Sequence, residues 1–355
     1  MYYSADMSHD TFTTDDLDLR IVHALQVSPR APWSLVASVT GADRATVMRR
    51  WRRMEEAGAA WITCYPVFTL GHAFAIVELT CTHGQTLQVA ARLAADPHAV
   101  TVVACAGSHD LGMEVITRDL RDESRYVLER LTAVEGIREV RTHQAAAYYR
   151  DASQWRLGLL DATAERRLAA FADTSARAGR PPSANPGTAV TEAQHEVAYA
   201  LAADPRMPVA DLAARLGVSP ATAHRRLTGL LAAQPVLRCE LARSLTPWPV
   251  SATFFLRCPA DKIDVTAQAL STLREVRAVM ATVGPSSLCF TAWVPSVSHV
   301  YRLESQLAAR MPHVQVADRA FVIRPIKLMG QLLDEEGRRT GTVPIDLRRS
   351  PLELT

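Results

Sequence analysis

Two pairs of adjacent arginines, Arg49-Arg50 and Arg225-Arg226, stand in segments that follow one pattern. A guanidinium group is planar and stays charged, and it binds a phosphate or the edge of a guanine base through paired hydrogen bonds. These residues therefore offer recognition of nucleic acid rather than the making or breaking of covalent bonds. Whether they can act in this way depends on the elements that position them.

The first pair lies in GADRATVMRRWRRM at 41–54, where apolar residues recur with the spacing of one helix face. We expect that face to pack in a small core, which leaves most of the arginines outside. Arg49 is then placed to read a guanine edge, and Thr46 to touch a thymine methyl group or a phosphate. Arg50 and Arg53 are expected to bind phosphates, which sets the register on DNA without reading its sequence.

The two segments are copies of an internal repeat. Residues 41–54 return as GVSPATAHRRLTGL at 217–230, at an offset of 176 residues, and Pro29-Arg30 falls on Pro205-Arg206 at the same offset. A repeat of this size means that one module of about half the chain is written twice. The predicted DNA contacts are Arg44, Thr46, Arg49, Arg50 and Arg53 in the first copy, and Thr222, His224, Arg225 and Arg226 in the second. The second copy has fewer arginines, so we expect the first to carry more phosphate contacts.

Each copy opens with three short helices, expected in the first copy at about 17–25, 33–39 and 43–56. Asp43 can cap the third of these helices, and in the second copy Ser219 takes the cap with Pro220 at the first helical position. Three helices with a glycine turn before the last are the plan of a helix-turn-helix domain.

The second part of each copy predicts the order strand, helix, strand, strand, helix, strand of a ferredoxin-like domain. In the first copy these elements are expected at about 74–79, 86–95, 100–106, 111–117, 123–131 and 137–147. In the second they are expected at about 251–258, 261–272, 276–283, 288–294, 297–310 and 313–323. The chain is therefore predicted to be an α+β protein with two winged or tri-helical helix-turn-helix domains and two ferredoxin-like βαββαβ domains in tandem.

The expected domain boundaries follow from these elements and from the segments between them. A charged helix at 162–178 and a proline- and glycine-rich linker at 179–187 separate the copies, and the chain after Leu333 is expected to be loose. The expected ranges are 14–66 and 190–244 for the helix-turn-helix domains, 67–150 and 245–328 for the ferredoxin-like domains, 151–189 for the helix and linker, and 329–355 for the tail.

Composition limits the function classes. The chain has 355 residues, 48% apolar and 21% charged, with a net charge of only +2, so a nucleic-acid signal must be local. It has no run of about 18 apolar residues and no secretory leader, and its six cysteines stand singly. We expect a cytoplasmic protein with reduced thiols, no membrane span, no metal and no cofactor.

The residues quoted at 41–58 and 217–227, together with DLDLRIVHAL at 16–25, resemble the leucine-responsive/asparagine regulator (Lrp/AsnC) family of prokaryotic transcription factors. The resemblance covers about 14–148 and 190–328. The second copy keeps the family's Ser-Pro helix opening, whereas the first has Asp43-Arg44 there. The resemblance implies a DNA-binding regulator that is not an enzyme.

The family usually has one such unit, dimerises through the βαββαβ domain and can bind an amino acid or related effector near the loop between the second and third strands. Carried over, the effector residues here are Gly107, Ser108, His109 and Asp110, with Gly284, Ser286 and Ser287 in the second copy. Asp110 resembles the family's acidic residue in this loop, which meets an effector's amino group, but Ser287 replaces it in the second copy. Alternatively, Gly107 and Gly284 only permit a tight turn.

The tandem arrangement suggests an intramolecular pseudo-dimer, although a homo-oligomer with swapped domains is equally allowed. Its unequal helices would address half-sites about 34 Å apart in a non-palindromic double-stranded operator.

Two other functions remain open. Siroheme decarboxylases resemble the same architecture and work as paired subunits, so an enzyme is one alternative. The other is an effector-binding assembly module whose second helix-turn-helix domain is vestigial.

Overall fold

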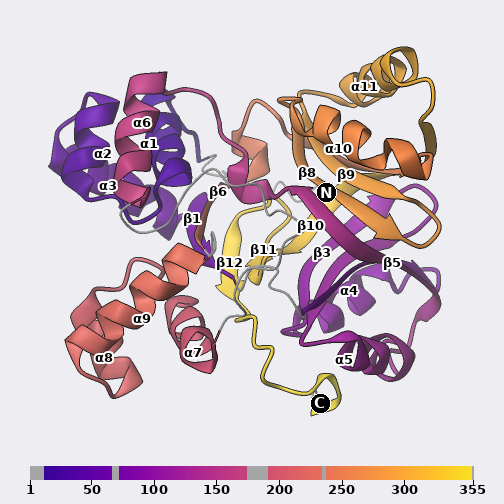
Figure 1. The fold of residues 1–355 in the computed structure, drawn as a ribbon, viewed down its shortest axis with the longest axis horizontal. Coiled ribbons are helices and arrows are strands. Elements are labelled where there is room, and N and C mark those ends of the chain that lie inside the picture. Colours follow the sequence, from indigo (N-terminus) through magenta and orange to yellow (C-terminus); the bar gives the residue numbers. More distant parts are fainter. Residues whose placement is uncertain (1–11, 66–71, 174–190, 234–236, 354–355) are drawn as a thin grey trace, which may run out of the picture.

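The structure is a computed structural model that describes residues 12–65, 72–173, 191–233 and 237–353. Figure 1 shows two groups of helices on one side of the molecule and two helix-covered sheets on the other. Strands from the end of the chain lie between the two sides. The repeat seen in the sequence therefore corresponds to two structural halves.

Both predicted helix-turn-helix domains are present. The first comprises α1 (Asp16–Val27), α2 (Trp33–Thr40) and α3 (Arg44–Glu56), and the second comprises α7 (Glu192–Leu201), α8 (Val209–Leu216) and α9 (Pro220–Ala233). In each domain the middle helix ends at a glycine in the left-handed region, Gly41 with φ 73° and Gly217 with φ 63°. Glycine adopts this conformation without steric penalty, so both chains turn into the third helix in the same way.

A short strand follows each helix-turn-helix domain. These strands, β1 (Ala60–Cys64) and β6 (Leu237–Leu241), pair with each other in antiparallel fashion, with Ile62 opposite Cys239. All ten of their residues are buried. The two halves are thus joined at the base of their helical domains by backbone hydrogen bonds.

The predicted βαββαβ order is confirmed in both halves. The first consists of β2 (Ala73–Cys81), α4 (Thr86–Ala94), β3 (Ala99–Ala106), β4 (Leu111–Thr117), α5 (Leu120–Arg125) and β5 (Ile137–Arg150), with a π-helical stretch, Tyr126–Arg130, extending α5. The second consists of β7 (Val250–Arg257), α10 (Ile263–Ser271), β8 (Val276–Val283), β9 (Leu288–Val294), α11 (Val297–Arg310) and β10 (Gln315–Leu328).

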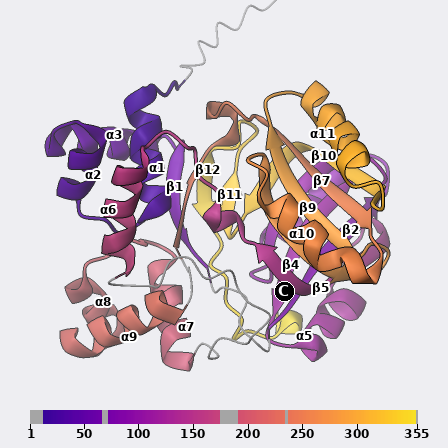
Figure 2. The same cartoon turned by 45° about the horizontal axis from the view of Figure 1, so that its top comes forward.

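The two sheets join at their edges into a closed barrel of eight strands. β5 pairs with β8 and β10 pairs with β3, so the last strand of each half borders the second strand of the other. The pairing of β10 with β7 closes the ring. Successive residues of a strand face opposite sides. Phe254 accordingly packs in the core under α10 and α11, whereas Thr253 faces the barrel interior. Figure 2 shows α10 and α11 lying against the outside of the second sheet.

The expectation of a loose segment after Leu333 is wrong for the residues that the structure describes. β12 (Arg339–Thr342) lies in this segment and pairs with β11 (Gln331–Leu333), which extends the sheet from β10. Ile345 and Leu347 are 7% and 3% exposed and belong to the main core. Their apolar side chains repeat every second residue, and this alternation outweighs the charged composition that suggested disorder.

The helix between the halves, α6 (Ala162–Asp173), packs on α1 and α2. The predicted linker at 179–187 lies outside the described residues. All six cysteines are unpaired, and every one except Cys258 is buried. Among the described residues, no helix is both long and apolar enough to cross a membrane.

Candidate functional site

The third helix of the first domain, α3, presents one apolar and one basic face. The expected core face is confirmed, because Val47, Trp51 and Met54 are at most 3% exposed. Asp43 caps the helix as predicted, and its carboxylate accepts a hydrogen bond from the backbone N–H of Thr46 at 2.9 Å. The first turn is therefore fixed while its outer face stays open to solvent.

The arginines of α3 divide into two groups. Arg44, Arg49 and Arg52 are exposed and form no ion pair with the residues that the structure describes. Arg50 contacts Asp15 and Asp18, and Arg53 lies 2.5 Å from Asp18, whose side chain is fully buried. These ion pairs fasten α3 to the N-terminal turn of α1. Arg50 and Arg53, both predicted to bind phosphates, therefore already hold the domain together.

The third helix of the second domain, α9, offers less charge. Ser219 caps it as predicted, because its hydroxyl accepts a hydrogen bond from the N–H of Thr222 at 3.2 Å. His224 and Arg225 are exposed, whereas Arg226 lies 3.1 Å from Glu196 of α7. As in the first domain, the second arginine of the pair forms an ion pair with the first helix of its domain, and the first arginine is exposed to solvent.

The two helix-turn-helix domains contact each other through a pair of arginines that the sequence analysis did not single out as functional. Arg30 donates to the carbonyl oxygen of Met207, and Arg206 donates to that of Ala31, both at 2.8 Å. The guanidinium of Arg206 also lies over the ring of Trp33, 4.1 Å from its centroid. The repeated Pro-Arg dipeptide was the signal that could have identified them.

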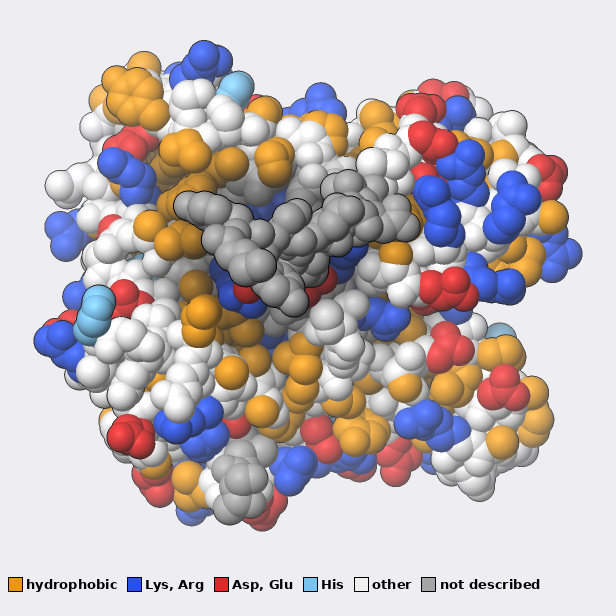
Figure 3. Space-filling view, turned by 180° about the vertical axis from the view of Figure 1, so that it is seen from behind, with side chains coloured by type: hydrophobic (Ala, Val, Ile, Leu, Met, Phe, Trp, Pro, Cys, Tyr) orange, Lys and Arg blue, Asp and Glu red, His pale blue; other side chains and the backbone are white. Residues whose placement is uncertain are grey.

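The surface view reflects the unequal charge of the two domains. In Figure 3, which views the molecule from behind, Lys and Arg side chains gather on the upper right lobe, which contains α1–α3. Acidic side chains lie among them. The basic signal is thus local, as the low net charge of the chain requires.

The predicted effector loops lie at the two edges where the sheets join. Gly107 and Gly284 both have φ 151°, and a Cβ atom at these positions would lie 2.8 Å from the carbonyl oxygen of Arg319 and 3.0 Å from that of Thr142, respectively. These two glycines therefore allow the strand of the other half to approach closely. Their equivalence also supports the duplication.

Asp110 and Ser287 close the same turn in the two halves. The Asp110 carboxylate accepts a hydrogen bond from the N–H of Cys81 at 2.7 Å, and the Ser287 hydroxyl accepts one from the N–H of Cys258 at 2.8 Å. The substitution of serine for aspartate thus preserves the turn. It changes only the charge that each loop presents.

The other loop residues join a network around Glu78. Ser286 is hydrogen-bonded to Nδ1 of His143 at 2.9 Å, and Nε2 of His143 lies 3.1 Å from Glu78. The ring of His109 is also close to Glu78, at 3.9 Å. All four side chains are buried, so the interface between the halves has a polar centre.

A small hollow adjoins this network, lined by Ser108, His109 and Arg141 among others. Ser108 is hydrogen-bonded to Asp318, and ligand atoms of Glu78, His109 and Asp318 lie within 4.8 Å of one another. Those three residue types can hold a metal ion. Arg141, however, lies 3.0 Å from Glu78, and its positive charge disfavours a cation there.

Comparisons with known proteins agree with these elements. Residues 15–55 and 199–231 match the model of the AsnC-type helix-turn-helix domain, and residues 74–152 match that of the Lrp/AsnC ligand binding domain. The two helix-turn-helix matches fall in the two halves of the chain, as expected from a tandem duplication.

Relatives of known name match one half of the chain. An uncharacterized HTH-type transcriptional regulator of Pyrococcus furiosus is 30% identical over 132 residues, which are 36% of this chain and 88% of that protein. The leucine-responsive regulatory protein of Rhizobium meliloti is 29% identical over 146 residues, 39% of this chain and 94% of that protein.

One solved structure shares the whole architecture. The siroheme decarboxylase NirDL aligns with a TM-score of 0.57 at 13% identity, over 96% of this chain and 98% of that chain. At this identity the likeness shows a common fold and no more.

Proposed function

Because the chain belongs to the Lrp/AsnC family of transcriptional regulators, we propose that it binds one DNA operator with both of its helix-turn-helix domains, held as an unequal pair within a single chain. The observation that carries this proposal is the contact between the two domains. Arg30 and Arg206 cross it in both directions, and β1 pairs with β6 beside it. A pair fixed in this way presents two recognition helices at a constant separation.

The exposed side chains of α3 and α9 are the proposed contacts with DNA. Arg49 and Arg225 project from equivalent places on the two helices, and neither forms an ion pair among the residues that the structure describes. Arg44 adds a charge at the start of α3 and His224 a polar group on α9. We assign base reading to Arg49 and Arg225 and phosphate binding to Arg44, with Thr46 and Thr222 beside them.

Arg50, Arg53 and Arg226 support the proposal differently. Their carboxylate partners hold them against the first helix of each domain. They can still lend positive charge to a nearby phosphate, because an arginine offers five donors. Their main role is to orient the recognition helix.

The operator is proposed to be non-palindromic. The first helix opens with Asp43-Arg44 and the second with Ser219-Pro220, so the side chains that meet the two half-sites differ. Two recognition helices with different side chains are expected to select half-sites of different sequence.

The experiment is fluorescence anisotropy with DNA from the chain's own promoter, over a range of salt concentrations. Arg49→Ala is expected to weaken specific binding by about 5- to 150-fold, the usual effect of losing a base-reading arginine. Arg225→Ala should also weaken it. Arg121→Ala, which removes an exposed arginine of α5, is the matched control and should leave affinity unchanged. Equal affinity for all four proteins would refute the proposal, and a perfectly palindromic footprint would refute the unequal pair.

We further propose that a small molecule regulates DNA binding through the ferredoxin-like domains. Support comes from the match of residues 74–152 to a ligand binding domain and from the hollow beside Ser108 and His109. Amino acids are the first class to test at this loop, by adding each of them to the anisotropy assay. Asp110 is engaged by Cys81, so recognition of an amino group would rest on the remaining capacity of its carboxylate.

The alternative function is that of an enzyme. The likeness over nearly the full length to the siroheme decarboxylase NirDL, also solved in co-complex with an iron-uroporphyrin III analogue, is the observation that favours it. We propose that the chain is not such an enzyme, because its named relatives are regulators. Incubation with siroheme decides the matter: carbon dioxide release with no binding to promoter DNA would establish the enzyme instead.

A further inference from the structure

The interior of the barrel is not filled by side chains. A hollow with a cavity volume of about 150 Å³ lies between the two sheets and the strands β1 and β6. Both halves line it with the residues that face inward from their strands; these include Thr101, Thr253, Phe255, Thr291, Trp293 and Lys327. Helices cover the outer faces of the same strands, and His109 of one sheet-edge loop also lines the hollow.

Positive charge gathers in this hollow. Four basic side chains line it, and Glu114 is the only carboxylate among the lining residues; the basic residues are Arg238, Arg243, Arg277 and Lys327. Glu240, just behind the wall, contacts both Arg238 and Arg277. Burial raises the pKa of Glu114, which favours its neutral form. The hollow therefore holds more positive charge than its own carboxylates neutralise.

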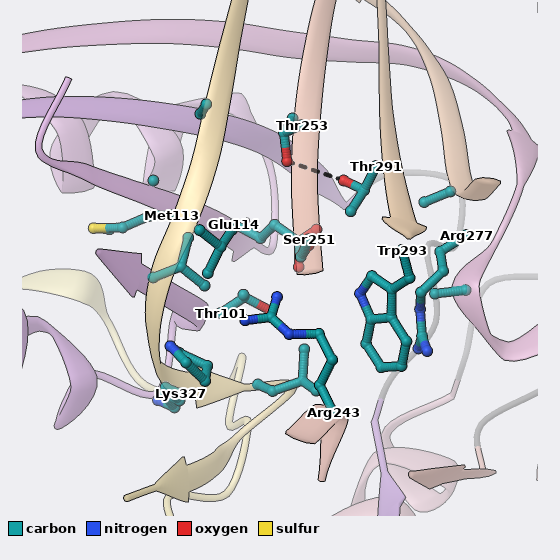
Figure 4. A pocket seen from close by; sticks show the side chains of 18 of the residues that line it. Thr101, Met113, Glu114, Arg243, Ser251, Thr253, Arg277, Thr291, Trp293 and Lys327 are labelled. Atoms are coloured by element: carbon teal, nitrogen blue, oxygen red, sulfur yellow. Dashed lines mark hydrogen bonds between the residues drawn. The ribbon is translucent and has the colours of Figure 1, made fainter. Parts of the chain in front are cut away.

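Two of the cations keep donors free for a ligand. Arg243 forms no ion pair within the described part of the chain, and Figure 4 shows its guanidinium reaching into the pocket near Thr101 and Ser251. The side chain of Arg277 is 5% exposed, yet its Nη1 has no hydrogen-bond partner. A buried donor without a partner is costly, and such groups in native proteins often mark a ligand or an ion.

Aromatic and apolar surface lies beside these donors. The guanidinium of Arg277 stacks on Trp293, 3.6 Å from the ring centroid. Trp61 also lines the hollow, and its buried indole N–H has no hydrogen-bond partner. A ligand that fits this wall has a flat apolar body as well as a negative charge.

We propose that the barrel hollow binds an amphipathic organic anion, an aromatic or polycyclic body with at least one carboxylate. Arg243 binds the carboxylate, the indole of Trp293 packs on the body, and the free Nη1 of Arg277 offers a further donor beside that indole. Burial in a low-dielectric site strengthens such charge-assisted hydrogen bonds. The regulatory consequence of binding rests on the proposed function, whereas binding itself does not.

The test uses two dyes that share one aromatic body. 8-Anilinonaphthalene-1-sulfonate is anionic, N-phenyl-1-naphthylamine is its neutral counterpart, and both fluoresce more strongly in an apolar site. With the full chain, the anionic dye is expected to bind at one site per chain and about tenfold more tightly than the neutral dye, the usual gain from a charged hydrogen bond.

Three variants locate the site. Arg243→Gln should remove the preference for the anion while leaving binding of the neutral dye unchanged, and Ser251→Phe should fill the hollow and abolish binding of both dyes. Arg121→Gln, far from the hollow, should behave as the original chain does. Thermal unfolding of each variant checks that it is folded.

Equal affinity for the two dyes, or an unchanged anion preference in Arg243→Gln, overturns the proposal. If Ser251→Phe does not fold, the proposal is still tested by two results: the preference of the original chain for the anionic dye, and the loss of that preference in Arg243→Gln. DNA binding is measured separately on the original chain, so operator binding without a preference for the anionic dye refutes the ligand site alone. Loss of operator binding with intact dye binding refutes the regulator alone.

Discussion

Arg30 and Arg206 reach across the contact between the two helix-turn-helix domains in opposite directions, and each ends on backbone carbonyl groups next to the other. The arrangement is a local twofold axis within one chain. It is not perfectly symmetric, because Arg206 also stacks on Trp33, whose equivalent in the second half is Val209.

This asymmetry predicts unequal mutational costs. Arg30→Ala should lower the free energy of unfolding by about 1–2 kcal/mol through its lost hydrogen bonds. Arg206→Ala should cost about 1 kcal/mol more, because it also loses the cation–π contact. Chemical denaturation of the single and double variants measures both values. If the two arginines act independently, the losses in free energy of unfolding add. If they form one cooperative contact, the double variant loses less than the sum of the two single variants.

The glycines of the sheet-edge loops give a second prediction. Gly107→Ala and Gly284→Ala place a methyl group against a backbone oxygen of the neighbouring strand, so each should destabilise the chain by more than about 2 kcal/mol. Gly41→Ala is the matched control: its φ is also positive, but nothing lies within 4 Å of the new methyl group. It should cost about 1 kcal/mol. Equal costs in denaturation would show that close packing at the edges is unimportant.

The fold was largely predictable because its signals are local. The caps at Asp43 and Ser219, the glycine turns and the alternation of the strands all lie within a few residues of the elements they define. Because the chain is duplicated, each of these signals occurs twice, and the two copies support the same prediction. The C-terminal segment was mispredicted because part of its support comes from a residue distant in sequence: the N–H of Arg339 donates to the carbonyl oxygen of Gly58 at 2.8 Å.

The site was less predictable because its contacts are long-range. Sequence identified the arginines of α3, but not that Asp18 would engage Arg53. The cations of the barrel hollow stand on separate segments with no shared spacing. Arg243, for instance, precedes β7 and Lys327 lies on β10, yet both line the same hollow.

His23 predicts an acid-sensitive link between the first helical domain and the segment after β5. Its ring is fully buried, and Nδ1 accepts hydrogen bonds from the N–H groups of Leu159 and Leu160, both at 2.9 Å. Burial, together with the nearby Arg156 charge, lowers the pKa of His23 to about 4. An unfolded histidine titrates near 6.5, so between these values the unfolded chain binds the proton and the folded chain does not.

Stability from His23 is therefore present above pH 6.5 and is lost as pH falls towards 4. Between pH 6.5 and 5 this residue should remove up to about 2 kcal/mol from the free energy of unfolding. His23→Gln should be less stable at pH 7 and should show a pH slope smaller by about one proton. His83→Gln, at an exposed site, should keep the original slope. Urea denaturation at several pH values gives the slopes, and identical slopes for all three proteins would contradict the assignment.

Lys327, which lines the barrel hollow, predicts a pH dependence of the same sign at alkaline pH. Its side chain is fully buried, and Nζ donates to the carbonyl oxygen of Asp96 at 2.7 Å. Burial lowers the pKa of Lys327 to about 7, although the nearby Asp96 opposes the shift. Because an unfolded lysine titrates near 10.4, the unfolded chain holds a proton between pH 7 and 10 that the folded chain has released. Stability therefore rises with pH across this window, and the full cost of burying the charge is felt below pH 7.

Lys327→Met removes that cost, so its advantage over the original chain should be greatest near pH 6 and should shrink by about 2–3 kcal/mol on going to pH 9. Lys262→Met, at an exposed site, is the control and should leave the pH dependence unchanged. An organic anion in the hollow would favour the charged form of Lys327, so saturation with 8-anilinonaphthalene-1-sulfonate should move the window upward in pH. Denaturation series with and without the dye measure this shift. If the pH range over which stability rises is the same with and without bound dye, the anion binds too far from Lys327 to affect its protonation.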